Sequence, residues 1–205
     1  DVALAEKANR QWKMDVNMLL KTAGMPIEDV RSADKLAWKL KLEGFKAPKT
    51  DKGNTSIKNE YLLSLEHPVF TAIARARELN HLREEFIEKK LLEMIAPDGR
   101  LHPHYVQTAR RASKEEAEGT RSGRLSARNP NEQQIPKRSS MLVDPFTLQL
   151  DVTGKKGVRI GKVIRATRIA DPGFKWGKYD FDSQEPRWQC HYGLKQALPG
   201  AQEAR

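Results

Sequence analysis

The sequence from Gly123 to Arg138 reads GRLSARNPNEQQIPKR and contains very little that a hydrophobic core could bury. Its 16 residues include four cations and four amide side chains, together with glycine and proline turn signals. Guanidinium groups and amides are the side chains that hold phosphates and contact base edges. We therefore expect an irregular, exposed element that binds a nucleic acid, rather than a core strand or helix.

The positive charge of the chain is concentrated around this stretch. In 205 residues, 37 Lys and Arg outnumber 27 Asp and Glu, which gives a net charge of +10 and a pI near 9.7. Between Gly99 and Arg168, 15 cations stand against 6 anions, a surplus of nine. Such an excess favours a polyanionic partner, because neutralised phosphates release condensed counterions. A basic surface without a partner is the alternative from charge alone.

Length, cysteine content and hydropathy limit the class of protein further. The chain is long enough for one large domain or two small ones. The single cysteine, Cys190, excludes an internal disulfide framework and fits a reducing compartment. No apolar run approaches the roughly 20 residues that cross a bilayer. The start at Asp1 is neither a signal peptide nor a natural initiator, so we expect a trimmed or processed end.

Two long helices are expected in the first half. From Val2 to Ala23 apolar residues recur at spacings of three and four, and Gly24 followed by Pro26 ends the run. Pro68 is well placed at the first position of a second helix, which would reach about Ile95 over roughly 40 Å. Its expected apolar face consists of Phe70, Ile73, Leu79, Leu82, Phe86, Ile87 and Leu91.

Smaller elements are expected between these helices. Ser32 is a plausible N-cap for a short helix, whose apolar side would carry Leu36, Leu40 and Trp38. The lysine- and glycine-rich segment from Ala47 to Asn54 predicts a loop. Thr55 or Ser56 would cap another short helix that runs to Leu65.

The composition changes after a turn at residues 97–99. Segments 101–108, 158–169 and 178–182 are rich in β-branched and aromatic residues and predict strands. Segment 139–157 is polar and irregular, which indicates a hairpin or a loop insertion, and we assign it no function.

The Gly123–Arg138 stretch resembles a signature of family A DNA polymerases, the bacterial polymerase-I-like and phage enzymes, which runs close to T-G-R-L-S-S-x-x-P-N-L-Q-N-I-P-x-R. The present chain departs from it at Ser122, Ala127, Glu132 and Gln134. The resemblance implies an α+β fold. Residues 1–97 would form an elongated two-helix thumb, and residues 98–205 would form the N-terminal part of an antiparallel β palm, through motif A, in an incomplete polymerase domain.

A second stretch, WGKYDFDSQEPR at residues 176–187, is similar to motif A of this family, D-[YF]-S-Q-x-E-x-R, and especially to its phage form D-Y-S-Q-Q-E-P-R. Asp180 matches the motif's acid without gaps, whereas Asp182 and Ser183 stand where Ser and Gln are usual. A register that uses Asp182 as the key acid needs two deletions, so we prefer Asp180. Taken alone, two alternating aspartates on a strand would more often simply face solvent.

The chemistry implied by the resemblance is phosphoryl transfer, which requires charge compensation more than covalent catalysis. Two Mg²⁺ ions about 3.5–4 Å apart serve that purpose, and Mg²⁺ is typically held by one or two carboxylates. By resemblance, Asp180 and the carbonyl of Phe181 would be metal ligands. Glu185 would pack under the incoming sugar and exclude a 2′-hydroxyl, and Arg187 would be a supporting catalytic cation.

The first signature carries over residue by residue to primer-template DNA. Arg124 matches the arginine that reaches the minor groove at the primer terminus, and Asn131 and Gln133 match amides that contact minor-groove edges. Minor-groove acceptors occur at every base pair, so such donors check the shape of a pair without reading its sequence. Arg138 matches a cation near the incoming dNTP. In the inter-helix region, Lys49 and Lys52 would grip the duplex backbone, beside Lys46 and Lys58.

Two family elements are not found after motif A: a fingers helix with Arg, Lys and Tyr, and a palm hairpin with the second catalytic Asp. One catalytic acid does not make a two-metal site. The sequence therefore predicts that this chain alone is inactive. It would be a truncated or split polymerase, and a second polypeptide or the missing C-terminal half would supply the fingers and the second Asp.

The expected function is template-directed DNA synthesis in DNA replication, by a phage-like enzyme in the cytoplasm of a bacterial or phage-infected cell, neither secreted nor bound to a membrane. One alternative is a catalytically silent duplex-DNA-binding module derived from a polymerase. Another is a single-subunit RNA polymerase. Glu185 argues against an RNA polymerase, since it matches the residue that rejects ribose, and Glu185→Ala is expected to increase ribonucleotide incorporation.

Overall fold

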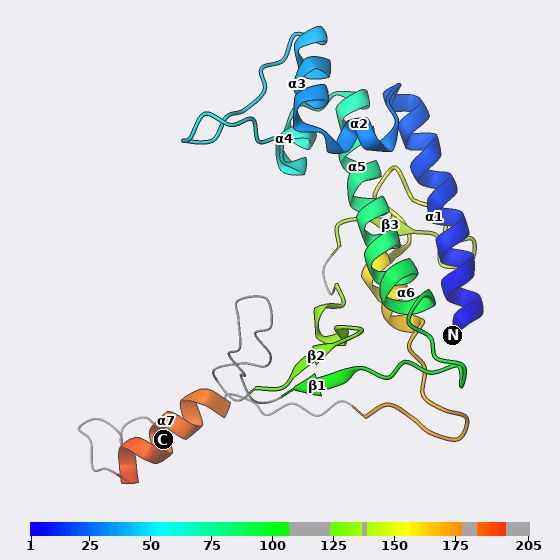
Figure 1. The fold of residues 1–205 in the computed structure, drawn as a ribbon, viewed down its shortest axis with the longest axis vertical. Helices are drawn as coiled ribbons and strands as arrows, with labels where there is room; N and C mark the ends of the chain where they lie inside the picture. The colour runs from blue at the N-terminus through cyan, green and yellow to red at the C-terminus, as the bar shows by residue number, and fades with distance from the viewer. Residues whose placement is uncertain (107–123, 137–138, 178–183, 196–205) are drawn as a thin grey trace. The chain divides into compact units, whose positions relative to one another are not determined.

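The computed structural model describes residues 1–106, 124–136, 139–177 and 184–195 (Figure 1). The chain divides into two compact units, Asp1–Arg168 and Ile169–Arg205. The first unit holds the helices and hairpins described below, and the described residues of the second hold one helix, α7 (Gln184–Lys195). Over the described residues, we find no helix with the length and apolar character that a bilayer crossing demands.

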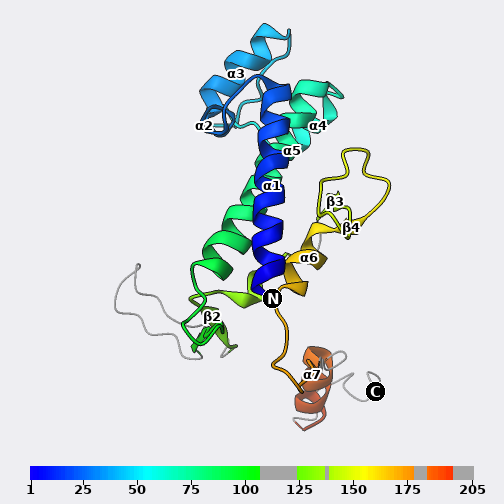
Figure 2. The ribbon, with the colours of Figure 1, turned by 90° about the vertical axis from the view of Figure 1, so that its right-hand side faces the viewer.

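The two long helices are α1 (Val2–Ala23) and α5 (Pro68–Leu82), and they pack side by side (Figures 1 and 2). Helix α1 ends as the sequence predicts, because Gly24 takes the left-handed conformation with φ of 65° and its N–H bonds back to the last turn. Pro68 occupies the first turn of α5. The predicted apolar faces of both helices are confirmed, since nearly all of their members are buried in a common core.

Helix α5 continues directly into η1 (Arg83–Leu92), a π-helical segment that the sequence does not predict. Its first residue, Arg83, is buried and donates hydrogen bonds to Asn9 at 2.8 Å and Glu88 at 2.9 Å. A widened turn of this kind depends on such tertiary contacts rather than on the local hydrophobic period.

Three short helices lie between α1 and α5: α2 (Ile27–Arg31), α3 (Ala33–Leu42) and α4 (Asn59–Ser64). Ser32 caps α3 as predicted, by accepting from the Lys35 N–H. The expectation that Trp38 faces the core is wrong, because its side chain is 63% exposed. The predicted caps Thr55 and Ser56 are also wrong, since α4 begins after Lys58 and has no side-chain cap.

The second half of the first unit forms two antiparallel pairs. Strand β1 (His104–Val106) pairs with β2 (Ser126–Arg128), and β3 (Leu142–Val143) pairs with β4 (Val158–Arg159). The strand predicted at 101–108 is confirmed over 104–106, and the one predicted at 178–182 lies outside the described residues.

The strand predicted over 158–169 is wrong beyond Arg159, where α6 (Ile160–Ala166) begins. Ile160, Val163 and Ile164 are all buried and stand at positions i, i+3 and i+4 of one helical face. Burial of that face against the core outweighs the β preference of the individual residues, because propensity is only a weak prior.

Segment 139–157, expected to be a hairpin or a loop insertion, forms strand β3 and the connection to β4 in the β3–β4 hairpin, which is anchored to α1. The Trp12 indole N–H donates to the Leu148 carbonyl at 3.0 Å, and a carboxylate oxygen of the buried Asp15 accepts from the Leu150 N–H at 2.8 Å. Its apolar side chains join the core of α1 and α5, namely Met141, Val143, Leu148 and Leu150. The α+β class is therefore confirmed, whereas the functional boundary at residues 97 and 98 stays a prediction.

Candidate nucleic-acid interface

The signature stretch folds as strand β2, a turn, and the short 3₁₀ helix η2 (Glu132–Gln134). Asn131 caps η2, because its side-chain oxygen accepts from the Gln133 N–H at 3.2 Å. The side chain of Asn131 is half-buried and that of Gln133 is exposed. The irregular, mostly surface-lying element expected from the sequence is thus confirmed, and the turn places the two predicted minor-groove amides near each other.

The amide of Gln133 pairs with the backbone of β2. Its oxygen accepts from the Ala127 N–H at 3.2 Å, and its nitrogen donates to the Leu125 carbonyl at 2.8 Å. Leu125 and Ala127 are two residues apart, so these bonds imitate a neighbouring strand along an edge of β2. A strand edge covered in this way is less open to unwanted pairing. Gln133 thus ties the turn to the strand that follows the exposed Arg124.

Glu132 lies in η2 between the two amides and forms an ion pair with Arg168, which follows α6. The bond lengths are 3.0 Å from Arg168 Nε to one carboxylate oxygen and 3.2 Å from an Arg168 terminal nitrogen to the other. The two side chains are only 19% and 13% exposed. Arg168 also donates to the Ile164 carbonyl and the Thr167 hydroxyl, each at 2.9 Å. This bidentate pair ties η2 to the C-terminal end of α6.

The ion pair of Glu132 and Arg168 was not predicted from the sequence. The available signal was Glu132 itself, a charged residue where the resembled signature has leucine. Its partner could not be named from the pattern, because Arg168 lies 36 residues away and belongs to a segment predicted as a strand.

The predicted duplex-gripping lysines lie in the loop between α3 and α4. Lys49 forms an isolated antiparallel bridge with Thr55, and Lys52 is in the turn between them. The loop is closed by a hydrogen bond from the Thr50 N–H to the Asn54 carbonyl at 2.8 Å. The four predicted cations are all exposed: Lys46, Lys49, Lys52 and Lys58.

Only part of the predicted nucleotide site lies within the described residues. Asp180, Phe181 and Arg138 are outside them. Glu185 and Arg187 occupy the first turn of α7, and Arg187 is exposed. No cluster of three or more His, Cys, Asp or Glu in the described ranges could hold a metal ion.

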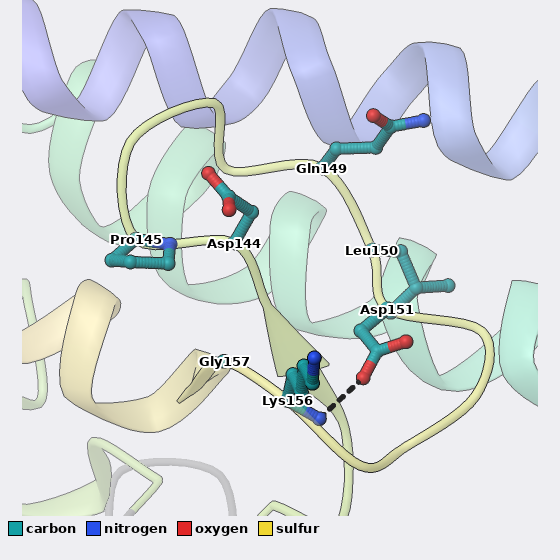
Figure 3. A pocket seen from close by; sticks show the side chains of 7 residues that line it. All are labelled: Asp144, Pro145, Gln149, Leu150, Asp151, Lys156 and Gly157. Carbon is teal, nitrogen blue, oxygen red and sulfur yellow. Dashed lines mark hydrogen bonds between the residues drawn. The ribbon is translucent and has the colours of Figure 1, made fainter.

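A cavity of about 320 Å³ lies on the β3–β4 hairpin, between the turn 144–150 and the loop 151–157 (Figure 3). Asp144 and Asp151 line it together with Lys156. Hydrogen bonds from Thr153 and from the Lys156 N–H hold the pKa of Asp151 far below its ordinary value, and backbone donors at Thr147 and Phe146 lower the pKa of Asp144. Both carboxylates are therefore ionised at neutral pH.

Comparison with known proteins defines the class. The profile of DNA polymerase family A matches residues 4–203, so this chain belongs to that family. The family expected from the two signatures is therefore confirmed, and the chain's relatives include phage enzymes.

Individual relatives are similar at moderate identity. A DNA-directed DNA polymerase of Pseudomonas phage M6 is 34% identical over 169 residues, which are 81% of this chain and 22% of that protein. DNA polymerase DpoZ of Acinetobacter phage SH-Ab 15497 is 31% identical over 73% of this chain and 22% of its own length. The thermostable DNA polymerase I of Thermus aquaticus is 31% identical over 71% of this chain and 14% of its own.

A solved structure shows a looser likeness. The POL domain of Pol1 from M. smegmatis, in complex with DNA primer-template and dNTP, has 26% sequence identity and a TM-score of 0.48, over 68% of this chain and 24% of that one. The present chain spans about a fifth of the length of the two phage polymerases and 14% of the Thermus aquaticus enzyme.

Proposed function

We propose that this chain contributes the thumb, residues 1–97, and the N-terminal palm, residues 98–205, to a polymerase that performs template-directed DNA synthesis. The observation that carries the proposal is the family match over residues 4–203, within which both signatures fall. Relatives over most of the chain are named as DNA polymerases. The fold supports the proposal in two further ways. The signature turn lies at the surface and is bonded to β2, and the loop between α3 and α4 presents exposed lysines.

The duplex would be held at two places in the first unit. Lys49 and Lys52 would contact backbone phosphates as point charges, with no sequence preference. Arg124, Asn131 and Gln133 would face the minor groove near the primer terminus, where donors meet acceptors at every base pair. Because the Gln133 amide bonds to Leu125 and Ala127 in this structure, it would have to exchange those two bonds for a base contact.

The nucleotide would be held by the motif A segment. Arg138 and Glu185 would bind the incoming dNTP, and Glu185 would close the space that a 2′-hydroxyl needs. Arg187, exposed on α7, would be a supporting cation. Asp180 and the Phe181 carbonyl would hold Mg²⁺, for which a carboxylate and a carbonyl oxygen are a fitting donor set. When bound, the metal supplies charge compensation for the transferring phosphoryl group.

We propose that other parts of the polymerase complete the reaction centre. The fingers and a second catalytic aspartate would come from sequence outside these 205 residues, in the same or a second polypeptide. The relatives support this division, since each extends well beyond the segment that matches.

Duplex binding by this chain tests the DNA-holding half of the proposal. We expect Lys49→Ser/Lys52→Ser to weaken binding to a primer-template duplex and to make the negative slope of log K against log salt shallower by about 1.8, because two phosphate contacts are lost. Fluorescence anisotropy with a labelled duplex measures both. The matched control is Lys13→Ser/Lys21→Ser, which removes two exposed lysines from α1. Equal slopes for the two double variants would exclude the loop as a phosphate grip.

A further inference from the structure

We propose that the β3–β4 hairpin and the start of α6 form a second DNA-binding surface, which holds a single strand by stacking a base on Phe146 and pairing phosphates with Lys155, Lys156, Arg159 and Lys162. This goes beyond the duplex grip and the nucleotide site proposed above. Figure 2 shows the loops of this hairpin projecting to the side of α1. We call this set of residues the hairpin surface.

Its charge is unusually one-sided. Segment 152–170 contains six cations and no Asp or Glu. Lys155, Lys156, Arg159 and Lys162 are all exposed. Among the described residues none of these four forms an ion pair, although many other cations of the same unit do, including Arg31 with Glu84. Cations left without counter-charges on a folded surface are suited to a polyanion, because binding it releases counterions.

The two lysines are presented by a rigid loop. One Asp151 carboxylate oxygen accepts from the N–H groups of Lys155 at 2.9 Å and Lys156 at 2.8 Å, while the other accepts from Thr153. At Gly157, φ is 125° and a Cβ atom would lie 2.4 Å from the Val143 carbonyl oxygen, so the chain passes very close to β3. Backbone already ordered in this way loses less entropy on binding.

Phe146 supplies the contact that distinguishes a single strand. Its side chain is 81% exposed, on a turn fixed by the Asp144 carboxylate, which accepts from the Phe146 N–H at 2.9 Å and the Thr147 N–H at 2.7 Å. Lys7 on α1 donates to the Phe146 carbonyl at 2.6 Å. An exposed ring on a fixed turn offers its face to a base. In a duplex those faces are occupied by neighbouring bases, whereas in a single strand they are free.

The cavity beside this turn determines on which side the phosphates and the base of the bound DNA strand lie. Pro145, next to Phe146, and Lys156 line the same cavity (Figure 3), so the aromatic turn and the lysine loop belong to one surface. Asp144 and Asp151 keep phosphates out of the cavity itself. Phosphates would therefore follow the four cations, while a base lies on the Phe146 side. The four cations outnumber these two carboxylates.

Anisotropy with this chain and a labelled thymidine oligonucleotide, long enough for a site of about 4–16 nucleotides, tests the proposal. We expect Phe146→Ala to weaken single-strand binding by about 5- to 100-fold, the loss of one stacked base. Phe146→Trp should preserve the affinity. For single-strand binding, Lys155→Ser/Lys156→Ser should make the negative slope of log K against log salt shallower by about 1.4. Circular dichroism would verify that each variant is folded.

The controls separate this surface from the duplex grip. Phe174→Ala removes another exposed ring, 76% exposed and outside the hairpin, and should leave binding unchanged. A fully paired duplex should bind Phe146→Ala as well as the parent chain. Unchanged single-strand affinity of Phe146→Ala, or an equal loss for duplex and single strand, would overturn the proposal. Neither result would bear on Lys49 and Lys52, whose test uses duplex alone.

Discussion

At the scale of single residues, the ion pair of Glu132 and Arg168 determines how firmly the signature turn is held. Both side chains are mostly buried, and Arg168 has carbonyl and hydroxyl partners besides the carboxylate. The two residues are therefore unequal. Loss of Arg168 leaves a carboxylate buried without a counter-charge, whereas loss of Glu132 leaves a cation that still donates to oxygen atoms.

A double-mutant cycle tests this asymmetry. We expect Arg168→Leu to lower the free energy of unfolding by about 3–5 kcal/mol and Glu132→Leu to lower it by less. The double variant should recover most of the loss, because an apolar pair of similar volume replaces a buried ion pair at little cost. Urea denaturation supplies the free energies. Additive effects of the two substitutions would show that the pair has no coupling and that Arg168 acts through its other contacts.

At the same scale, the sequence predicted where the site residues lie better than what they contact. Arg124, Asn131 and Gln133 were expected on an exposed, irregular element because their stretch has nothing to bury; the structure confirms this for Arg124 and Gln133, whereas Asn131 is half-buried. The bonds of the Gln133 amide to Leu125 and Ala127 could not be foreseen, since they depend on the three-dimensional path of the turn. The roles of these residues toward DNA stay predictions.

At the scale of elements, the β3–β4 hairpin depends on two glycines of different kinds. Gly154 has φ of 67° and open space where a Cβ would lie. Gly157 has φ of 125°, and a Cβ added there would clash with the backbone of Val143. We expect Gly154→Ala to cost about 1–2 kcal/mol for the left-handed backbone. Gly157→Ala should cost about 3 kcal/mol or more, because strain and overpacking add. Thermal denaturation of both variants would contradict this account if their midpoints were equal.

The same hairpin should depend on pH in a defined direction. Hydrogen bonds lower the pKa of Asp144 and Asp151 in the folded protein. Their stabilising contribution is therefore complete above the unfolded value of about 3.9, and it is lost as the pH falls through the lowered folded values. The NMR shift of the Trp12 indole N–H, which bonds to Leu148, reports on hairpin docking. A transition of this shift centred at or above about pH 3.9 would contradict the lowered pKa values.

Elements with a strong local period were predictable, and those that depend on distant contacts were not. The regular spacing of apolar residues specified α1 and α5, and Gly24 and Pro68 marked their ends. The π-helical segment η1 was not predicted, because its first residue, Arg83, pairs with Asn9 across 74 residues. Segment 160–166 was predicted as part of a strand because Ile160, Val163 and Ile164 are β-branched, although their buried face has the spacing of a helix.

At the scale of the whole molecule, three regions of one compact unit carry the proposed contacts with nucleic acid. The lysine loop and the signature turn would hold the duplex, and the hairpin surface would hold a single strand. All three belong to the unit Asp1–Arg168. The motif A helix α7 belongs to the other unit, Ile169–Arg205, together with the proposed metal ligands, whereas Arg138 of the proposed nucleotide site belongs to the first unit.

Primer extension tests the central claim most directly. The assay would use this sequence joined to, or mixed with, the fingers and remaining palm of a family A polymerase, with a primed template, Mg²⁺ and four dNTPs. We predict extension by the wild-type sequence and a loss of at least about 10³-fold with Asp180→Ala, because a metal ligand is removed. Asp182→Ala is the matched control and should retain activity. Equal extension by Asp180→Ala and the wild type would contradict the assignment of Asp180, and no extension by a folded, duplex-bound wild-type complex would contradict a role in DNA synthesis.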